Sequence, residues 1–222
     1  MKWKYVLPVT LLTALLTACA TSHKGISYLA LGDSYTIGES VPTNLNFPYQ
    51  LADSLGNEFQ AYESPVIIAR TGWRTDQLLE AIESAHLKNE YDLVTLLIGV
   101  NNEFQGRSPE EYTREFTLLC QKAVELAASR KDRVVILSIP DYGYTPYGAS
   151  GQQRISPRIN QFNQINKRIA DSLDLVYIDI TGISRRGLLE PVLVADDGLH
   201  PSPEMYALWV EEILKKFRIV KE

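Results

Sequence analysis

Cysteine, histidine and clusters of basic residues are scarce in this sequence, and each scarcity removes a class of site or partner. The two cysteines, Cys19 and Cys120, are too few and too oddly placed for the disulfide framework of a small secreted domain. With only three histidines, the chain has no cluster with the spacing of metal ligands, so no metal site is expected. The net charge of −5 comes without a basic run, which argues against nucleic acid as a partner.

The N-terminal apolar stretch, Tyr5–Ala18, is too short to span a bilayer, and Lys2 and Lys4 precede it, as in a secretory signal. It ends in Leu16-Thr17-Ala18-Cys19, which resembles the lipobox of bacterial lipoproteins. The resemblance implies that Cys19 becomes the lipidated first residue, anchored to a membrane of the bacterial cell envelope on its periplasmic or surface face. The alternatives are an ordinary signal peptide with an incidental cysteine and an uncleaved anchor. All three predict export.

Length and composition indicate one globular domain. The chain has 222 residues, 45% of them apolar and 22% charged, which is enough to bury one core. We therefore divide it into a signal peptide (1–18), a lipidated cysteine with a short polar tether (19–25) and a domain (26–222). Cys120 is then unpaired, and we interpret it as a small buried residue on a helix.

Within the domain, apolar segments of strand length alternate with segments of helical periodicity. The predicted strands are 26–31, 61–69, 92–99, 133–140 and 175–180, and the predicted helices are 49–55, 75–87, 109–127, 159–172 and 203–217. Pro65 lies inside the second predicted strand and indicates a strand end or a sheet edge there. Segment 92–99 has the continuous apolar content of a central strand. The alternation predicts a three-layer α/β/α sandwich with a parallel sheet of about five strands, in an order the pattern leaves open.

The first apolar segment stops at Gly32-Asp33-Ser34, where a parallel strand would deliver a serine to the ligand-binding edge of the sheet. Gly32 permits a sharp turn, and Ser34 then lies near the first turn of a helix. A serine placed there can attack an acyl carbon. The other interpretation is that Asp33 or Ser34 caps the helix, and these three residues alone favour it.

A nucleophilic serine needs a histidine base and a carboxylate that orients it. His23 lies in the tether and His86 at a predicted helix end, so we interpret both as solvated. His200 lies in a loop with Asp197 three residues before it, and Gly198 between them allows the carboxylate to fold back. An ordinary loop before a helix is an equally good interpretation of these residues.

Four segments together resemble the SGNH superfamily of GDSL-type esterases and lipases, from about residue 26 to the C-terminus. The matching residues are Gly32-Asp33-Ser34, Gly72, Gly99-x-Asn101 and Asp197-x-x-His200. The resemblance implies a flavodoxin-like fold in which Ser34 is the nucleophile, His200 the base and acid, and Asp197 the orienting acid. It also implies an oxyanion hole made by the Ser34 and Gly72 backbone N–H groups and the Asn101 amide.

One position departs from this family, because Asn102 stands where it commonly has aspartate. We expect a changed loop hydrogen bond or a changed pocket polarity. Asp196 rivals Asp197 on charge alone, but the family spacing selects Asp197.

Several aromatic residues allow two interpretations. Tyr142, Tyr144 and Tyr147 follow the fourth predicted strand, and Trp73 and Arg74 flank Gly72. They either line an acyl or sugar pocket or pack on their own backbone, core and surface.

These features predict a serine ester hydrolase that works through an acyl-serine and needs no cofactor. Its expected partners are a small-molecule or lipid acyl ester, as for an esterase or lysophospholipase, and the membrane that holds its anchor. A carbohydrate O-acetyl esterase and a non-catalytic surface-binding lipoprotein are the alternatives. The absence of an appended carbohydrate module favours the acyl ester.

Overall fold

The computed structural model describes residues 25–59 and 63–218, together with Met1. The predicted signal peptide after Met1, the predicted tether residue His23 and the predicted lipidation site Cys19 lie outside the described residues. Among the residues that the structure describes, no helix is long and apolar enough to cross a membrane.

The five strands are parallel and form one sheet in the order β2-β1-β3-β4-β5. The strands are β1 (Tyr28–Gly32), β2 (Val66–Ala69), β3 (Leu93–Leu97), β4 (Val134–Leu137) and β5 (Val176–Ile178). Every residue of β1, β3 and β4 is buried, because helices cover both faces. The prediction of β3 as the central strand and of a sheet edge beside Pro65 is confirmed.

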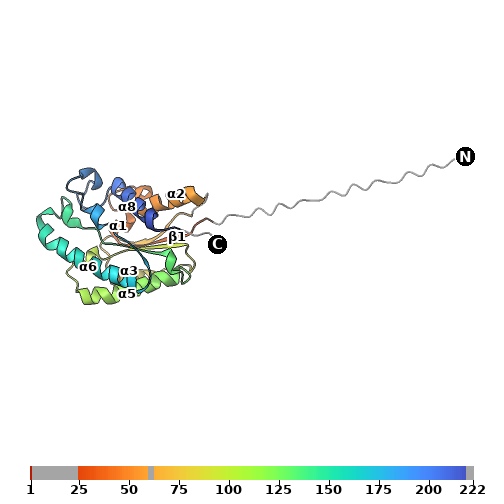
Figure 1. Cartoon of the computed structure of the whole chain (residues 1–222), viewed down its shortest axis with the longest axis horizontal. Coiled ribbons are helices and arrows are strands. Elements are labelled where there is room, and N and C mark those ends of the chain that lie inside the picture. The colour runs from red at the N-terminus through yellow and green to blue at the C-terminus, as the bar shows by residue number, and fades with distance from the viewer. Residues whose placement is uncertain (2–24, 60–62, 219–222) are drawn as a thin grey trace.

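Helices pack on both faces of the sheet, which confirms the three-layer α/β/α sandwich (Figure 1). One face carries α2 (Phe47–Phe59) and α8 (Pro203–Lys216), and the other carries α3 (Thr75–Ser84), α5 (Pro109–Leu126) and α6 (Gln152–Ser172). Three short helices, α1 (Ser34–Ile37), α4 (Val100–Phe104) and α7 (Thr181–Ser184), begin where strands end. Cys120 is fully buried in α5, and burial raises the pKa of its thiol to about 12.

Three helices differ from the prediction by more than one residue. Helix α2 runs from Phe47 to Phe59 rather than from 49 to 55. Helix α6 begins at Gln152 rather than 159, because Ile155 and Ile159 are both buried on one face and their packing carries the helix through Pro157. Helix α3 ends at Ser84, before the predicted end at 87. The segment after β5, in which no helix was predicted, contains α7.

The strand order explains where a site forms. Strand β1 lies between β2 and β3, and the helices that follow β1 and β3, α2 and α5, cover opposite faces (Figure 1). A crevice therefore opens at the carboxyl ends of β1 and β3, where the sheet order reverses.

Candidate active site

Ser34 is the first residue of α1, directly after β1, and it is buried. Asp33 is the N-cap, since its Oδ1 accepts the Tyr35 N–H at 3.0 Å. The cap interpretation therefore holds for Asp33, and Ser34 stands at the start of the helix. Glycine is required at position 32, because a Cβ there would lie 2.4 Å from the carbonyl oxygen of Leu97 on the neighbouring strand.

The loop before α8 brings His200 and Asp197 to this serine. His200 Nε2 lies 3.0 Å from Ser34 Oγ, and His200 Nδ1 lies 2.6 Å from Asp197 Oδ2. Gly198 has a left-handed φ of 71°, which lets the carboxylate fold back toward the imidazole ring. The hydroxyl, the imidazole and the carboxylate form a continuous chain along which a serine proton can pass to the histidine. Asp196 is exposed and takes no part in this chain.

Hydrogen bonds keep the Asp197 carboxylate ionised. Burial raises the pKa of Asp197, but donors from Ser40, His200 and the loop backbone outweigh burial and lower that pKa well below its ordinary value. A permanently charged carboxylate can stabilise the imidazolium that forms when His200 takes a proton.

Gly72 and Asn101 face the same cavity as Ser34. Gly72 lies in the turn after β2 with a φ of 81°, which favours glycine. Asn101 lies in the first turn of α4, and its Nδ2 donates to the Trp73 carbonyl at 3.0 Å. The amide also donates a long, weak hydrogen bond of 3.5 Å to Asp33 Oδ2, which a substrate oxygen can replace.

The cavity beside Ser34 has a volume of about 210 Å³. Its lining is mostly apolar and aromatic and consists of Ser34, Tyr35, Thr71, Gly72, Val100, Asn101, Phe104, Tyr142, Tyr147, Leu199 and His200. Of the three loop tyrosines, Tyr144 stays outside the cavity, with its ring over the Arg185 guanidinium. Trp73 and Arg74 are also outside it: the first packs against the core, and the second pairs with Asp76.

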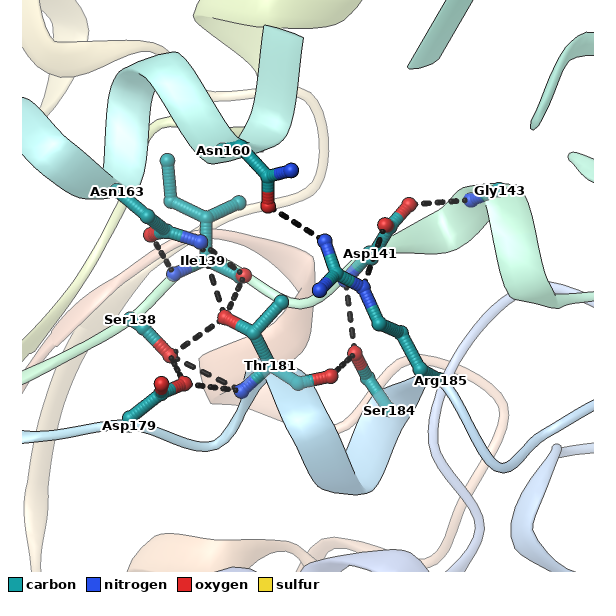
Figure 2. Close-up of polar contacts among 10 residues, drawn as sticks. All are labelled: Ser138, Ile139, Asp141, Gly143, Asn160, Asn163, Asp179, Thr181, Ser184 and Arg185. Carbon is teal, nitrogen blue, oxygen red and sulfur yellow. Dashed lines mark hydrogen bonds and ion pairs between the residues drawn. The ribbon is translucent and has the colours of Figure 1, made fainter. Parts of the chain in front are cut away.

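A polar network holds the loop that carries Tyr142 (Figure 2). Asp141 is fully buried, caps the 3-10 turn Tyr142–Tyr144 by accepting the Gly143 N–H at 3.0 Å, and pairs with Arg185 Nε at 3.0 Å. Displacing the loop would leave a buried charge unpaired, so this wall of the cavity is anchored at its base.

Asn102, the departure from the family pattern, bonds away from the cavity. It is buried, its Oδ1 accepts the Thr75 N–H at 3.1 Å and its Nδ2 donates to Thr75 Oγ1 at 2.6 Å. The expectation of a changed loop hydrogen bond fits these contacts. Pocket polarity is unaffected, because Asn102 does not line the cavity.

Two side chains that the sequence did not single out support the site. Ser40 Oγ donates to Asp197 Oδ2 at 2.6 Å. Glu103, whose side chain is fully buried, accepts from Tyr142 at 2.7 Å and pairs with Arg158 at 2.9 Å. No local signal marks either residue, because their partners lie far away along the chain.

Asp33 makes the stability of the fold pH-dependent. Burial raises the pKa of its carboxyl to about 7, against 3.8 ordinarily, while the Tyr35 N–H and Asn101 hold it lower than burial alone would. The neighbouring Tyr35 and Tyr206 stay neutral, since burial raises their pKa values well above 10. Between pH 3.8 and about pH 7, Asp33 of the folded protein holds a proton that Asp33 of the unfolded chain has released. The free energy of unfolding therefore falls as pH rises through this interval.

We expect this fall to total about 4 kcal/mol by alkaline pH and to be absent in Asp33→Asn, which keeps the oxygen that caps Tyr35. Urea unfolding at about pH 5 and about pH 9 measures the part of the fall that lies above pH 5, about 3 kcal/mol. Asp53→Asn, an exposed change on α2, is the control and should retain the fall. An equal fall in Asp33→Asn would show that Asp33 is not its source.

A buried serine and a buried histidine in line with a more exposed aspartate, beside a cavity at the carboxyl edge of a parallel sheet, form the arrangement found in serine-dependent hydrolases. Residues 30–208 match the model of the GDSL-like lipase/acylhydrolase family, and the chain belongs to this family. It is therefore a carboxylic ester hydrolase. Among the described residues there is no group of three or more side chains that could hold a metal ion.

Individual relatives agree with this family. A Vibrio mimicus protein named arylesterase is 25% identical over 214 residues, covering 93% of this chain and 96% of its own. A G-D-S-L lipolytic protein from Veillonella parvula superposes with a TM-score of 0.65 at 20% identity, over 87% of this chain and 98% of its own. An acetyl xylan esterase from Geobacillus stearothermophilus superposes with a TM-score of 0.64 at 18% identity, over 89% of this chain and 98% of its own. The two structures share the fold.

Proposed function

We propose that the chain hydrolyses short-chain acyl esters through an acyl-serine intermediate on Ser34. Ser34 Oγ attacks the carbonyl carbon while its proton passes to His200 Nε2. The carbon–oxygen bond to the alcohol then breaks, and His200 returns the proton to the departing alcohol. Water attacks the acyl-serine by the same route and releases the acid. The observation that carries the proposal is the contact chain of 3.0 Å and 2.6 Å through His200 to Asp197.

The Ser34 and Gly72 N–H groups and the Asn101 amide are the proposed oxyanion donors. Their oxygen acceptor gains its charge only in the tetrahedral intermediate, so these donors favour the transition state over the bound substrate. No cofactor takes part in either half of this reaction.

The cavity supports a small acyl group and an apolar alcohol. At about 210 Å³ it is smaller than the roughly 300–1,000 Å³ of pockets for drug-sized ligands. Phe104 and Tyr147 line it and are both 56% exposed, so they form an apolar rim around its mouth. The surface of the cavity is predominantly apolar, which favours an apolar alcohol over a sugar. The name of the Vibrio mimicus relative, arylesterase, describes a substrate of this kind.

A substrate panel tests the proposal. We expect kcat/KM to be highest for aryl acetates and butyrates, to fall toward palmitate, and to be lower for lysophospholipids and acetylated xylan. Ser34→Ala supplies the blank for each substrate. Preference for a lysophospholipid or the acetylated glycan would replace the proposed substrate class. Failure of a fluorophosphonate to label Ser34, in a preparation where a control serine esterase reacts, would favour a non-catalytic binding protein.

We also propose that the protein is exported and held at a cell-envelope membrane by acyl chains on Cys19. The lipobox-like Leu16-Thr17-Ala18-Cys19 supports this proposal. Cys19→Ala is expected to leave the membrane fraction and to change in gel mobility. Unchanged fractionation and mobility would contradict the lipid anchor.

A further inference from the structure

Ser40 contacts the carboxylate that orients the histidine. Its Oγ donates to Asp197 Oδ2 at 2.6 Å, across 157 positions of the chain, and His200 Nδ1 lies 2.6 Å from the same oxygen. We propose that Ser40 is a positioning residue of the ester hydrolysis, whose hydroxyl holds the Asp197 carboxylate in line with His200. This inference rests on the proposed function, because it gives Ser40 a part in the same proton transfer.

The other bonds to Asp197 cannot fix the loop relative to the nucleophile. Asp197 Oδ1 accepts the backbone N–H groups of Leu199 and His200, each at 2.9 Å, and these donors belong to the same loop. They orient the carboxylate toward its own histidine and would move with the loop. Among the described contacts of this carboxylate, the bond from Ser40 is the one that reaches it from a different segment of the chain.

Ser40 is tied closely to the nucleophile. It follows α1, and the N–H groups of the two residues between that helix and Ser40 both donate to the Ser34 carbonyl at 3.1 Å. The position of Ser40 relative to Ser34 is therefore set by a single helical turn. Contacts run from Ser34 to His200, to Asp197, to Ser40 and back through α1, so the acid–base loop is held to the element that carries the nucleophile.

The backbone at Ser40 supports this assignment. Its φ is 65°, in the left-handed region that disfavours residues with a Cβ. A left-handed residue is common after the end of a helix, which accounts for Ser129 after α5. After α1 that position is already taken by Gly38, so the end of the helix does not account for the left-handed conformation of Ser40. Glycine would avoid the strain at position 40 but would lack the hydroxyl that Asp197 accepts.

The test compares Ser40→Gly with Ser40→Thr. In Ser40→Gly the hydroxyl is lost while the left-handed backbone is kept at no strain, so we expect kcat to fall about tenfold with KM and Tm nearly unchanged. The rate of fluorophosphonate labelling should fall in parallel. In Ser40→Thr the hydroxyl is kept at a strained β-branched position, so we expect a lower Tm and recovery of most of the lost kcat.

Ser129→Gly is the matched control. It makes the same change at another left-handed serine, near the carboxyl end of α5. The last residue of α5, Leu126, accepts the N–H of Tyr91 just before β3, so this serine lies toward the amino ends of the strands and away from the site. We expect its kcat to equal that of the unmodified protein. An unchanged kcat in Ser40→Gly, or an equal loss in Ser40→Thr with its fold intact, would overturn the role of Ser40. If Ser40→Gly does not fold, Ser40→Ala makes the same measurement. Survival of turnover in Ser34→Ala would instead contradict the proposed function itself.

Discussion

Ser34→Ala is expected to lower kcat by about 10⁵-fold while leaving the folded state intact. The Oγ atom is the proposed nucleophile, so its removal leaves the oxyanion donors and the cavity without a group to attack the ester. The fold should tolerate the change, because the α1 cap is supplied by Asp33 rather than by Ser34. Burst kinetics with an aryl acetate and circular dichroism of the same preparation measure the two effects.

The matched control for this change is Ser84→Ala, an exposed serine at the end of α3, which should leave kcat unchanged. His200→Ala should lose about as much as Ser34→Ala, and the double variant should lose no more than either single one, because the residues act as one unit. Turnover near the normal rate in Ser34→Ala would contradict the mechanism. Losses that multiply in the double variant would show that Ser34 and His200 act independently.

The sequence predicted the fold well because its signal is local. Buried parallel strands appear as continuous apolar runs, and the runs at β1, β3 and β4 lie where they were expected. The start of α6 was missed, because the residues around Pro157 are polar and only tertiary burial of Ile155 shows that they are helical. Strand order was open for a similar reason: it depends on which faces the crossovers take, and no single segment encodes that choice.

The candidate site was predictable to the extent that its residues follow strand ends or lie close together in sequence. Asp197 and His200 are three residues apart, so their contact could be expected from spacing. Ser40 and Glu103 could not, because each acts on a partner that only folding brings near. The cap interpretation holds for Asp33, whose Oδ1 accepts the Tyr35 N–H, but its raised pKa follows from burial and required the structure.

Asn101→Ala is expected to lower kcat by about 10²–10³-fold, the usual loss for one oxyanion donor, with a small change in KM. The effect on KM is small because the amide binds the neutral carbonyl of the substrate only weakly and binds the charged oxygen of the tetrahedral intermediate strongly. The Trp73 carbonyl also loses a partner, so stability should fall modestly. Steady-state kinetics with an aryl acetate and urea unfolding measure these effects.

The neighbouring asparagine supplies the contrast that separates an oxyanion donor from a structural amide. Asn102 is buried and bonds twice to Thr75, away from the cavity, so Asn102→Ala should lower the free energy of unfolding by about 1–3 kcal/mol and reduce kcat far less than Asn101→Ala does. If both variants lost kcat in proportion to stability, the loss in Asn101→Ala would reflect a loosened α4 rather than a missing donor. We expect Asn101→Ala to lose more kcat and Asn102→Ala to lose more stability. Both side chains project from α4 and differ in what they face, so only a donor at position 101 explains this result.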